Sequence, residues 1–124
     1  MTIYRKTLGK KGEELVINHL KEMGYIILEK NYINNRNLGE IDIIAKKDKN
    51  IFFIEVKSRK KDFLSPIELV PFSKRKKIIQ TAELFIVEKK IDLDENIVSF
   101  DIAYVNSENS VFYYKNAFQK ECNY

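Results

Sequence analysis

The strongest constraint on the fold lies between Gly39 and Arg59, where the sequence reads GEIDIIAKKDKNIFFIEVKSR. Two runs rich in β-branched and aromatic residues, Glu40 to Ala45 and Ile51 to Ser58, flank the polar segment KKDKN. Such runs on either side of a turn-forming segment predict an antiparallel β-hairpin. The chain must therefore build a sheet around these two strands.

Three ionisable residues, Asp42, Glu55 and Lys57, interrupt the apolar pattern of this hairpin. Side chains alternate between the two faces of a strand, so Glu55 and Lys57 point to the same side. If the loop comprises residues 47 to 50, the register pairs 44 with 53 and 46 with 51, and it sets Asp42 opposite Glu55. A shift of one residue would turn Asp42 to the other face.

Two facing carboxylates repel each other, and the repulsion grows where water is excluded. A divalent cation reverses the sign of that interaction, and carboxylate oxygens suit Mg²⁺ or Mn²⁺. The single histidine, His19, and the single cysteine, Cys122, have no partners at ligand spacing. We therefore expect Asp42 and Glu55 to bind Mg²⁺ or Mn²⁺.

A metal held in this way lowers the pKa of a bound water and neutralises charge on a phosphate oxygen, which is the chemistry of phosphodiester hydrolysis. Lys57 would lie beside it. The lysine could position the attacking water or stabilise the phosphate in the transition state, and the spacing leaves both roles open.

A helix is predicted from about Thr7 to Met23, because Val16 and Leu20 recur at helical spacing and Gly24 follows as a stop. Glu13 lies on the same apolar stripe. A carboxylate that faces a core is costly unless it is hydrogen-bonded or near a metal, so Glu13 is a candidate fourth member of the site. An acid favoured by the helix dipole is an equally good interpretation.

The other elements follow from similar patterns. We expect strands at Tyr25 to Asn31 and Ile97 to Val105, a helix from Lys74 to Glu88 with Ser73 as its cap, and an added edge strand at Val111 to Tyr114. The order is helix, three strands, helix, strand, which predicts an α/β (α+β) fold.

The 124 residues suffice for about one domain, so we expect a single domain over residues 1–124. With 44% hydrophobic and 32% charged residues, the composition is that of a folded globular protein and excludes a mainly disordered chain. The sequence has neither a run of 18 apolar residues nor the apolar centre of a secretory signal. We expect a cytoplasmic protein with no membrane partner.

Basic residues form two clusters, one from Lys57 to Lys61 and one from Lys74 to Lys77, in a chain of net charge +4. The second cluster opens the predicted helix, where the macrodipole disfavours each cation by about a few tenths of a kcal/mol. Phosphates bind helix N-termini and Lys/Arg clusters, although a solvated helix start explains the pattern equally well. The residues expected to contact nucleic acid are Arg59, Lys60, Lys74, Arg75 and Lys77.

Two further features stay unassigned to the site. Asp101, in SFDIAYV, either faces the same side as the carboxylate pair or is a hydrogen-bonded acid of its strand. The aromatic residues from Phe112 to Phe118 could stack on bases, but packing in the core or at a sheet edge is the stronger interpretation.

The motifs GEID and EVKSR, with their acidic residues thirteen positions apart, follow GKKGEELV and NY and precede SKRKKI and FDIAYV. Over about residues 8 to 105 this pattern resembles the YraN-like family of small bacterial proteins. That family is similar to a branch of the PD-(D/E)XK nuclease superfamily, which includes archaeal Holliday junction resolvases and restriction endonucleases.

The resemblance implies a restriction endonuclease-like core, a mixed β-sheet flanked by helices. It also implies that Asp42 and Glu55 are metal ligands, that Lys57 is the catalytic lysine, and that Glu13 is the helix acid of resolvase-like members. Ile41 stands where the superfamily name has proline, although the GEID form is usual in this branch, and Ser99 stands where the family tends to have arginine. Resolvases act as dimers, so a homodimer fits the resemblance.

Three hypotheses result. The first is a Mg²⁺-dependent endonuclease that cuts DNA, including branched or structured DNA. The second is a module on the same fold that binds DNA, RNA or another protein without cutting. The third is purely structural: Glu55 and Lys57 form a surface ion pair on an edge strand and Asp42 is a turn residue, which requires the face carrying Phe53 to be exposed.

Overall fold

The structure, a computed structural model, describes residues 3–34, 39–58 and 65–120. Its elements are α1 (Ile3–Glu22), β1 (Ile26–Ile33), β2 (Glu40–Lys47), β3 (Asn50–Ser58), the 3₁₀ turn η1 (Pro66–Leu69), α2 (Phe72–Glu88), β4 (Ile97–Val105) and β5 (Val111–Phe118). This order confirms the predicted α/β class. Among the described residues, no helix is both long and apolar enough to span a membrane.

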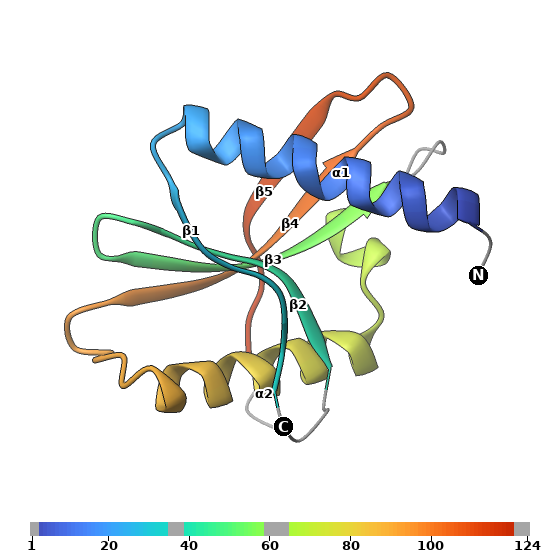
Figure 1. The fold of residues 1–124 in the computed structure, drawn as a ribbon. Helices are drawn as coiled ribbons and strands as arrows, with labels where there is room; N and C mark the ends of the chain where they lie inside the picture. Colours follow the sequence, from blue (N-terminus) through green and yellow to red (C-terminus); the bar gives the residue numbers. More distant parts are fainter. Residues whose placement is uncertain (1–2, 35–38, 59–64, 121–124) are drawn as a thin grey trace.

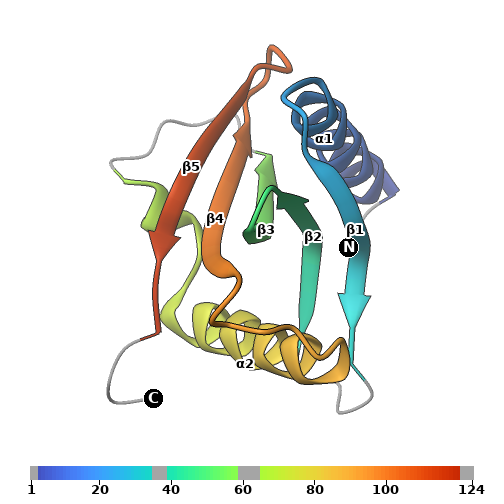
Figure 2. The ribbon, with the colours of Figure 1, turned by 90° about the vertical axis from the view of Figure 1, so that its left-hand side faces the viewer.

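The strands of the described chain form one mixed sheet in the order β1-β2-β3-β4-β5. β3 and β4 run parallel, and every other neighbouring pair runs antiparallel. Parallel neighbours need a crossover connection, and α2 lies within the one that joins β3 to β4. Figures 1 and 2 show α1 and α2 on opposite sides of the sheet.

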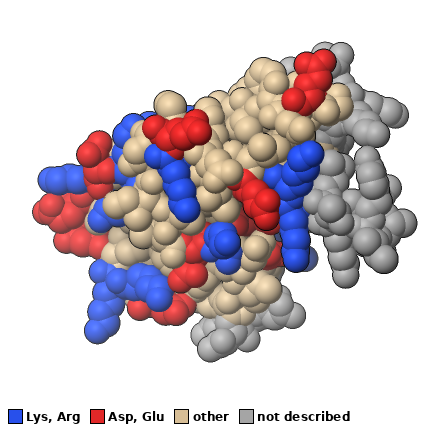
Figure 3. Space-filling view, turned by 45° about the horizontal axis from the view of Figure 1, so that its top comes forward, with Lys and Arg blue, Asp and Glu red and all other residues tan. Residues whose placement is uncertain are grey.

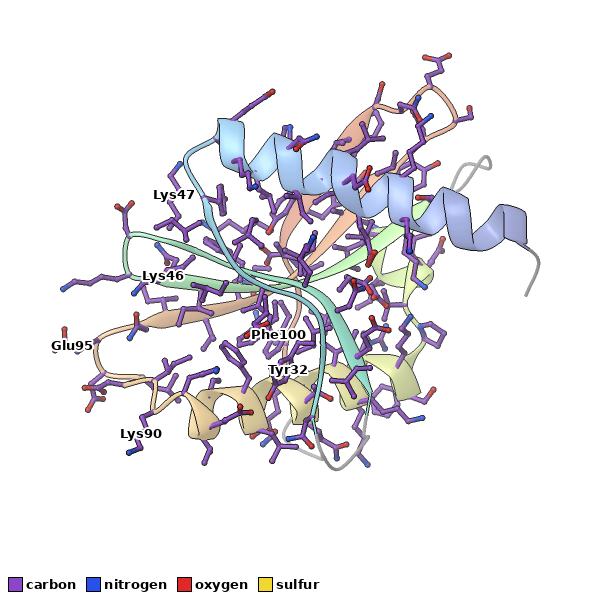
Figure 4. All side chains as sticks on the ribbon, viewed as in Figure 1. Tyr32, Lys46, Lys47, Lys90, Glu95 and Phe100 are labelled. Carbon is purple, nitrogen blue, oxygen red and sulfur yellow. The ribbon has the colours of Figure 1, made fainter. Side chains whose placement is uncertain are left out.

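The core lies in two layers, one under each helix. On the α2 side, Phe53 packs with Ile79 and Phe85, and on the α1 side Phe52 packs with Val16 and Leu20. Figure 4 shows Tyr32 and Phe100 in the layer between the sheet and α2. β3 is therefore a central strand with both faces covered. Because Phe53 is fully buried, the hypothesis of a surface ion pair on an edge strand is wrong.

The start of α2 differs from the prediction. Pro71 stands at the N-cap, with φ −58° and ψ 153°, and its carbonyl accepts hydrogen bonds from the N–H groups of Lys74 and Arg75 at 3.0 Å. The proline ring fixes φ near the value that a helix start requires. The predicted Ser73 cap is wrong, because Ser73 lies inside the helix.

The β2–β3 turn is also shorter than the predicted loop. Lys47 pairs with Asn50, which leaves Asp48 and Lys49 as the turn residues, and Asp48 takes a positive φ of 55°. Aspartate tolerates this conformation better than most residues. The side chains of Lys46 and Lys47 lie at this end of the sheet (Figure 4), and Lys47 Nζ donates a 2.8 Å hydrogen bond to the Met23 carbonyl.

Candidate active site

The candidate site begins where β2 and β3 separate. Their register is the predicted one, with residue 44 opposite 53 and 46 opposite 51. The ladder ends at Ile43 and Ile54, although both strands continue beyond it. Asp42 and Glu55 are the first residues past the end of the ladder, so their side chains meet where no backbone pairing closes the gap.

The side chain of Asp42 compensates for part of the missing backbone pairing between β2 and β3. Its Oδ2 accepts a hydrogen bond of 2.8 Å from the Val56 N–H, and a second hydrogen bond links its carboxyl group to that of Glu55. Burial, then the hydrogen bond to Glu55 and the charge of Glu55, raise the pKa of Asp42 to about 9, against a smaller lowering by the Val56 bond. The pair therefore holds a proton at neutral pH.

Glu55 is almost fully buried, with 2% of its surface exposed, and two lysines approach its Oε2. Lys74 Nζ, from α2, lies 2.6 Å away, and Lys57 Nζ, from the same strand, lies 3.9 Å away. Burial lowers the pKa of Lys57, while the Glu55 charge opposes that shift. Burial also acts to lower the pKa of Lys74, but the adjacent Glu55 carboxylate raises it above its ordinary value overall.

Glu13 reaches the same region from α1. Asn31 Nδ2, from β1, donates a 2.7 Å hydrogen bond to its Oε1, and the two residues line a cavity of about 220 Å³ together with Asp42. Burial raises the pKa of Glu13, the Asn31 bond lowers it, and the charges of Glu40 and Glu55 raise it further. Glu13 therefore faces the carboxylate pair from the α1 side of the sheet.

Gly12 lets α1 approach the end of β3. A Cβ atom at this position would lie 2.4 Å from Ser58 Oγ, which is far inside van der Waals contact. Ser58 follows Lys57 directly, so the approach brings the middle of α1, next to Glu13, against the strand that carries the site. Glycine allows this approach without disturbing Ser58, because a Cβ atom here would force the Ser58 hydroxyl to move.

The predicted nucleic-acid contacts have different environments. Arg75 donates a 3.1 Å hydrogen bond to the Val70 carbonyl and stacks over Phe72, so its guanidinium group holds the start of α2. Lys74 and Lys77 line a second cavity of about 280 Å³ on the α2 side. Arg59 and Lys60 lie outside the described residues. Figure 3 shows basic and acidic side chains interspersed over the α1 face.

Asp101 belongs to the opposite face from Glu55. It neighbours Ile54 across the parallel β3–β4 pairing, and its carboxylate accepts hydrogen bonds from the Ser99 and Tyr113 hydroxyls and, at 2.8 Å, from the Asn116 N–H. Of the interpretations left open, the one in which Asp101 faces the site is wrong, and the one in which it is a hydrogen-bonded acid of its strand is confirmed. The bonds hold β5 where its pairing with β4 shifts register.

Two contacts of the site were not expected. Asn31, whose φ of 50° breaks the regular run of β1, supplies the hydrogen bond to Glu13. Asparagine adopts this region more readily than other non-glycine residues, which is the signal that the sequence offers. The Lys74 contact with Glu55 depends on where α2 packs, and no local pattern indicates it.

The donor set fits one kind of metal. Within the described ranges, no three His, Cys, Asp or Glu side chains gather closely enough to hold an ion by themselves. Zinc centres need three or four such ligands, and the described residues do not provide that set. Mg²⁺ commonly binds through one or two carboxylates and keeps several waters, and the crowded Asp42–Glu55 pair fits that requirement.

Comparison with known proteins gives the family. The family model described as "Uncharacterised protein family UPF0102" matches residues 12–105, a range that contains Glu13, Asp42, Glu55, Lys57 and Lys74. A UPF0102 protein of Clostridium botulinum (strain Kyoto / Type A2) is 45% identical over 120 residues, which cover 92% of this chain and 95% of the relative. One from Dictyoglomus turgidum is 41% identical over 98 residues, or 78% and 80% of the two chains. The chain therefore belongs to the uncharacterised protein family UPF0102.

Proposed function

We propose that this chain is a Mg²⁺-dependent endonuclease of the PD-(D/E)XK superfamily that hydrolyses phosphodiester bonds in DNA. The observation that carries the proposal is the buried pair of carboxyl groups, Asp42 and Glu55, where β2 and β3 separate. Burying two acids side by side works against folding stability, so the pair needs another reason to exist. Strongly shifted pKa values in such clusters are typical of functional sites.

Asp42 and Glu55 are the residues that would hold Mg²⁺, which supplies charge neutralisation and a bound water of lowered pKa. Lys57 lies on the same side of β3 as Glu55, where its ammonium can orient the attacking water or offset charge on the phosphate. Glu13, fixed by Asn31, borders the cavity next to Asp42 and can accept a hydrogen bond from a water there.

The proposal extends to the substrate. Lys74 and Lys77 border the cavity on the α2 side, near the N-terminus of that helix, where a phosphate of the DNA backbone would be favoured. Arg59 and Lys60 follow β3 directly in the sequence and would add to this positive charge. We also propose that the substrate is branched or structured DNA, that the protein is cytoplasmic and that it forms a homodimer.

A cleavage assay tests the proposal. Purified protein with Mg²⁺ or Mn²⁺ is expected to cut labelled linear, flap or four-way-junction DNA, and EDTA is expected to stop the reaction. Asp42→Ala and Glu55→Ala should each lower the rate by about 100-fold or more, since each removes charge stabilisation in the transition state. Asp48→Ala, at the exposed hairpin turn, is the matched control. Cleavage that continues unchanged in both site variants would refute the proposal.

A second candidate is a nucleic-acid or protein-interaction module that does not cut. The ion pair between Lys74 and Glu55 favours it, because an ammonium group already offsets the charge of the carboxylate that a metal would need. This candidate predicts binding to DNA or RNA that weakens steeply with salt, with no cleavage under any divalent metal.

A further inference from the structure

The contact between α2 and the carboxylate pair carries a further inference. Lys74 Nζ lies 2.6 Å from Glu55 Oε2, which makes the two groups a close ion pair, and this buried oxygen has no hydrogen-bond partner among the described residues. The Glu55 side chain is 1% exposed, so its charge depends on the neighbours that the fold provides. Lys57 is more distant, at 3.9 Å, which leaves Lys74 as the nearer of the two cations.

A divalent cation and this ammonium group compete for the same oxygen. Mg²⁺ binds carboxylate oxygens at about 2.0–2.1 Å, so an ion on Glu55 Oε2 would lie close to Lys74 Nζ. Two cations at that separation repel strongly where water is excluded. Metal binding at Glu55 Oε2 therefore requires Lys74 to move.

We propose that Lys74 regulates the metal site: its ammonium group stays paired with the Glu55 carboxylate until a divalent ion displaces it. The inference rests on the proposed function, because it takes Glu55 as a metal ligand. The displaced ammonium then faces the cavity of about 280 Å³ that Lys74 shares with Lys77 and Ser73. A phosphate group of the substrate bound there would stabilise the displaced position, so metal and DNA would favour each other's binding.

The two lysines differ in their freedom to make this movement. The Lys74 side chain is 43% exposed and extends from the first turn of α2 into a region bordered by the cavity. The Lys57 side chain is 23% exposed and starts from the central strand. A lysine ammonium group on a flexible stem can exchange partners readily. Because Lys74 is the more exposed of the two lysines, we assign the exchange to Lys74.

Direct Mn²⁺ binding, followed by electron paramagnetic resonance or calorimetry without DNA, tests the inference. Lys74→Gln removes the competing charge and should tighten Mn²⁺ binding at least about fivefold relative to wild type. Lys74→Arg keeps a charge and adds a second donor for Glu55, so it should bind Mn²⁺ no more tightly than wild type. Lys76→Gln, an exposed lysine of the same helix turn, is the matched control.

The outcomes separate this inference from the proposed function. Equal or weaker Mn²⁺ binding by Lys74→Gln, with clear binding by wild type, overturns the role of Lys74 and leaves the metal site standing. Absence of Mn²⁺ binding in wild type and in Lys74→Gln overturns both. Tighter binding by Lys74→Gln that Lys76→Gln does not reproduce supports the inference, and thermal unfolding of each variant shows that it is folded.

Discussion

At the scale of single residues, Asp42 shows most clearly the conflict between folding and function. Its carboxylate is useful to the sheet only through the hydrogen bond from Val56, and it lies against the carboxyl group of Glu55. An asparagine could accept the same bond and also donate to Glu55, without the added charge. The choice of aspartate therefore lowers stability, which the proposed metal site would explain.

The first prediction follows from that conflict. The folded state raises the pKa of Asp42 to about 9, above its ordinary 3.8. The part of the folding free energy that comes from this raised pKa is therefore fully present below pH 3.8 and is lost as the pH rises toward 9. In EDTA, the free energy of unfolding should fall from pH 5 to pH 8, by at most about 1.4 kcal/mol per pH unit. Asp42→Asn should flatten this slope and raise the melting temperature at pH 8.

Urea unfolding at pH 5, 6.5 and 8 measures the effect, with Asp48→Asn as the control for a surface aspartate of the same hairpin. A wild-type slope that Asp42→Asn leaves unchanged would show that the proton is held elsewhere.

At the scale of elements, the features that could be predicted are those that depend on the local periodicity of the sequence. The two hairpin strands and the bounds of β4 followed from local runs of residues, and the hairpin register is the one given by the assumed loop of residues 47 to 50. Ser73 was misplaced because Pro71 starts α2 earlier, and the face of Asp101 depended on how β3 and β4 align. The Lys74–Glu55 contact joins segments that only the crossover brings together, so no local signal could show it.

The second prediction concerns how α1 meets β3. Gly12→Ala should cost about 1–2 kcal/mol of stability, because the new Cβ would lie 2.4 Å from Ser58 Oγ and force that hydroxyl to move. Removing that oxygen leaves the nearest atoms at 3.8 Å, so Gly12→Ala combined with Ser58→Ala should recover wild-type stability or exceed it. Ser58→Ala alone should be nearly neutral, since its buried hydroxyl has no hydrogen-bond partner among the described residues.

A double-mutant cycle of thermal or urea unfolding measures the coupling between the two positions. Additive effects would mean that α1 does not approach β3 through Gly12.

At the scale of the whole molecule, the site draws on both layers of the fold. α1 brings Glu13 to one side of the sheet, α2 brings Lys74 to the other, and the gap between β2 and β3 holds the two carboxyl groups between them. The mixed topology is what allows this, because the crossover that makes β3 and β4 parallel also carries α2 across the sheet. A ligand bound at the gap would therefore join elements that otherwise meet only through the core.

The third prediction is that Mn²⁺ or Mg²⁺ stabilises the folded chain as a whole. A ligand that binds only the native state adds about 1.4 kcal/mol at ten times its dissociation constant, which should raise the melting temperature by about 3–6 °C in a chain of this size. Glu55→Gln keeps the volume of the side chain but removes a metal-binding oxygen, so its melting temperature should not respond to the metal. Glu95→Gln, which alters an exposed glutamate far along the chain, should respond like wild type. Equal shifts in all three proteins, measured by thermal unfolding with and without EDTA, would place the bound ion away from Glu55.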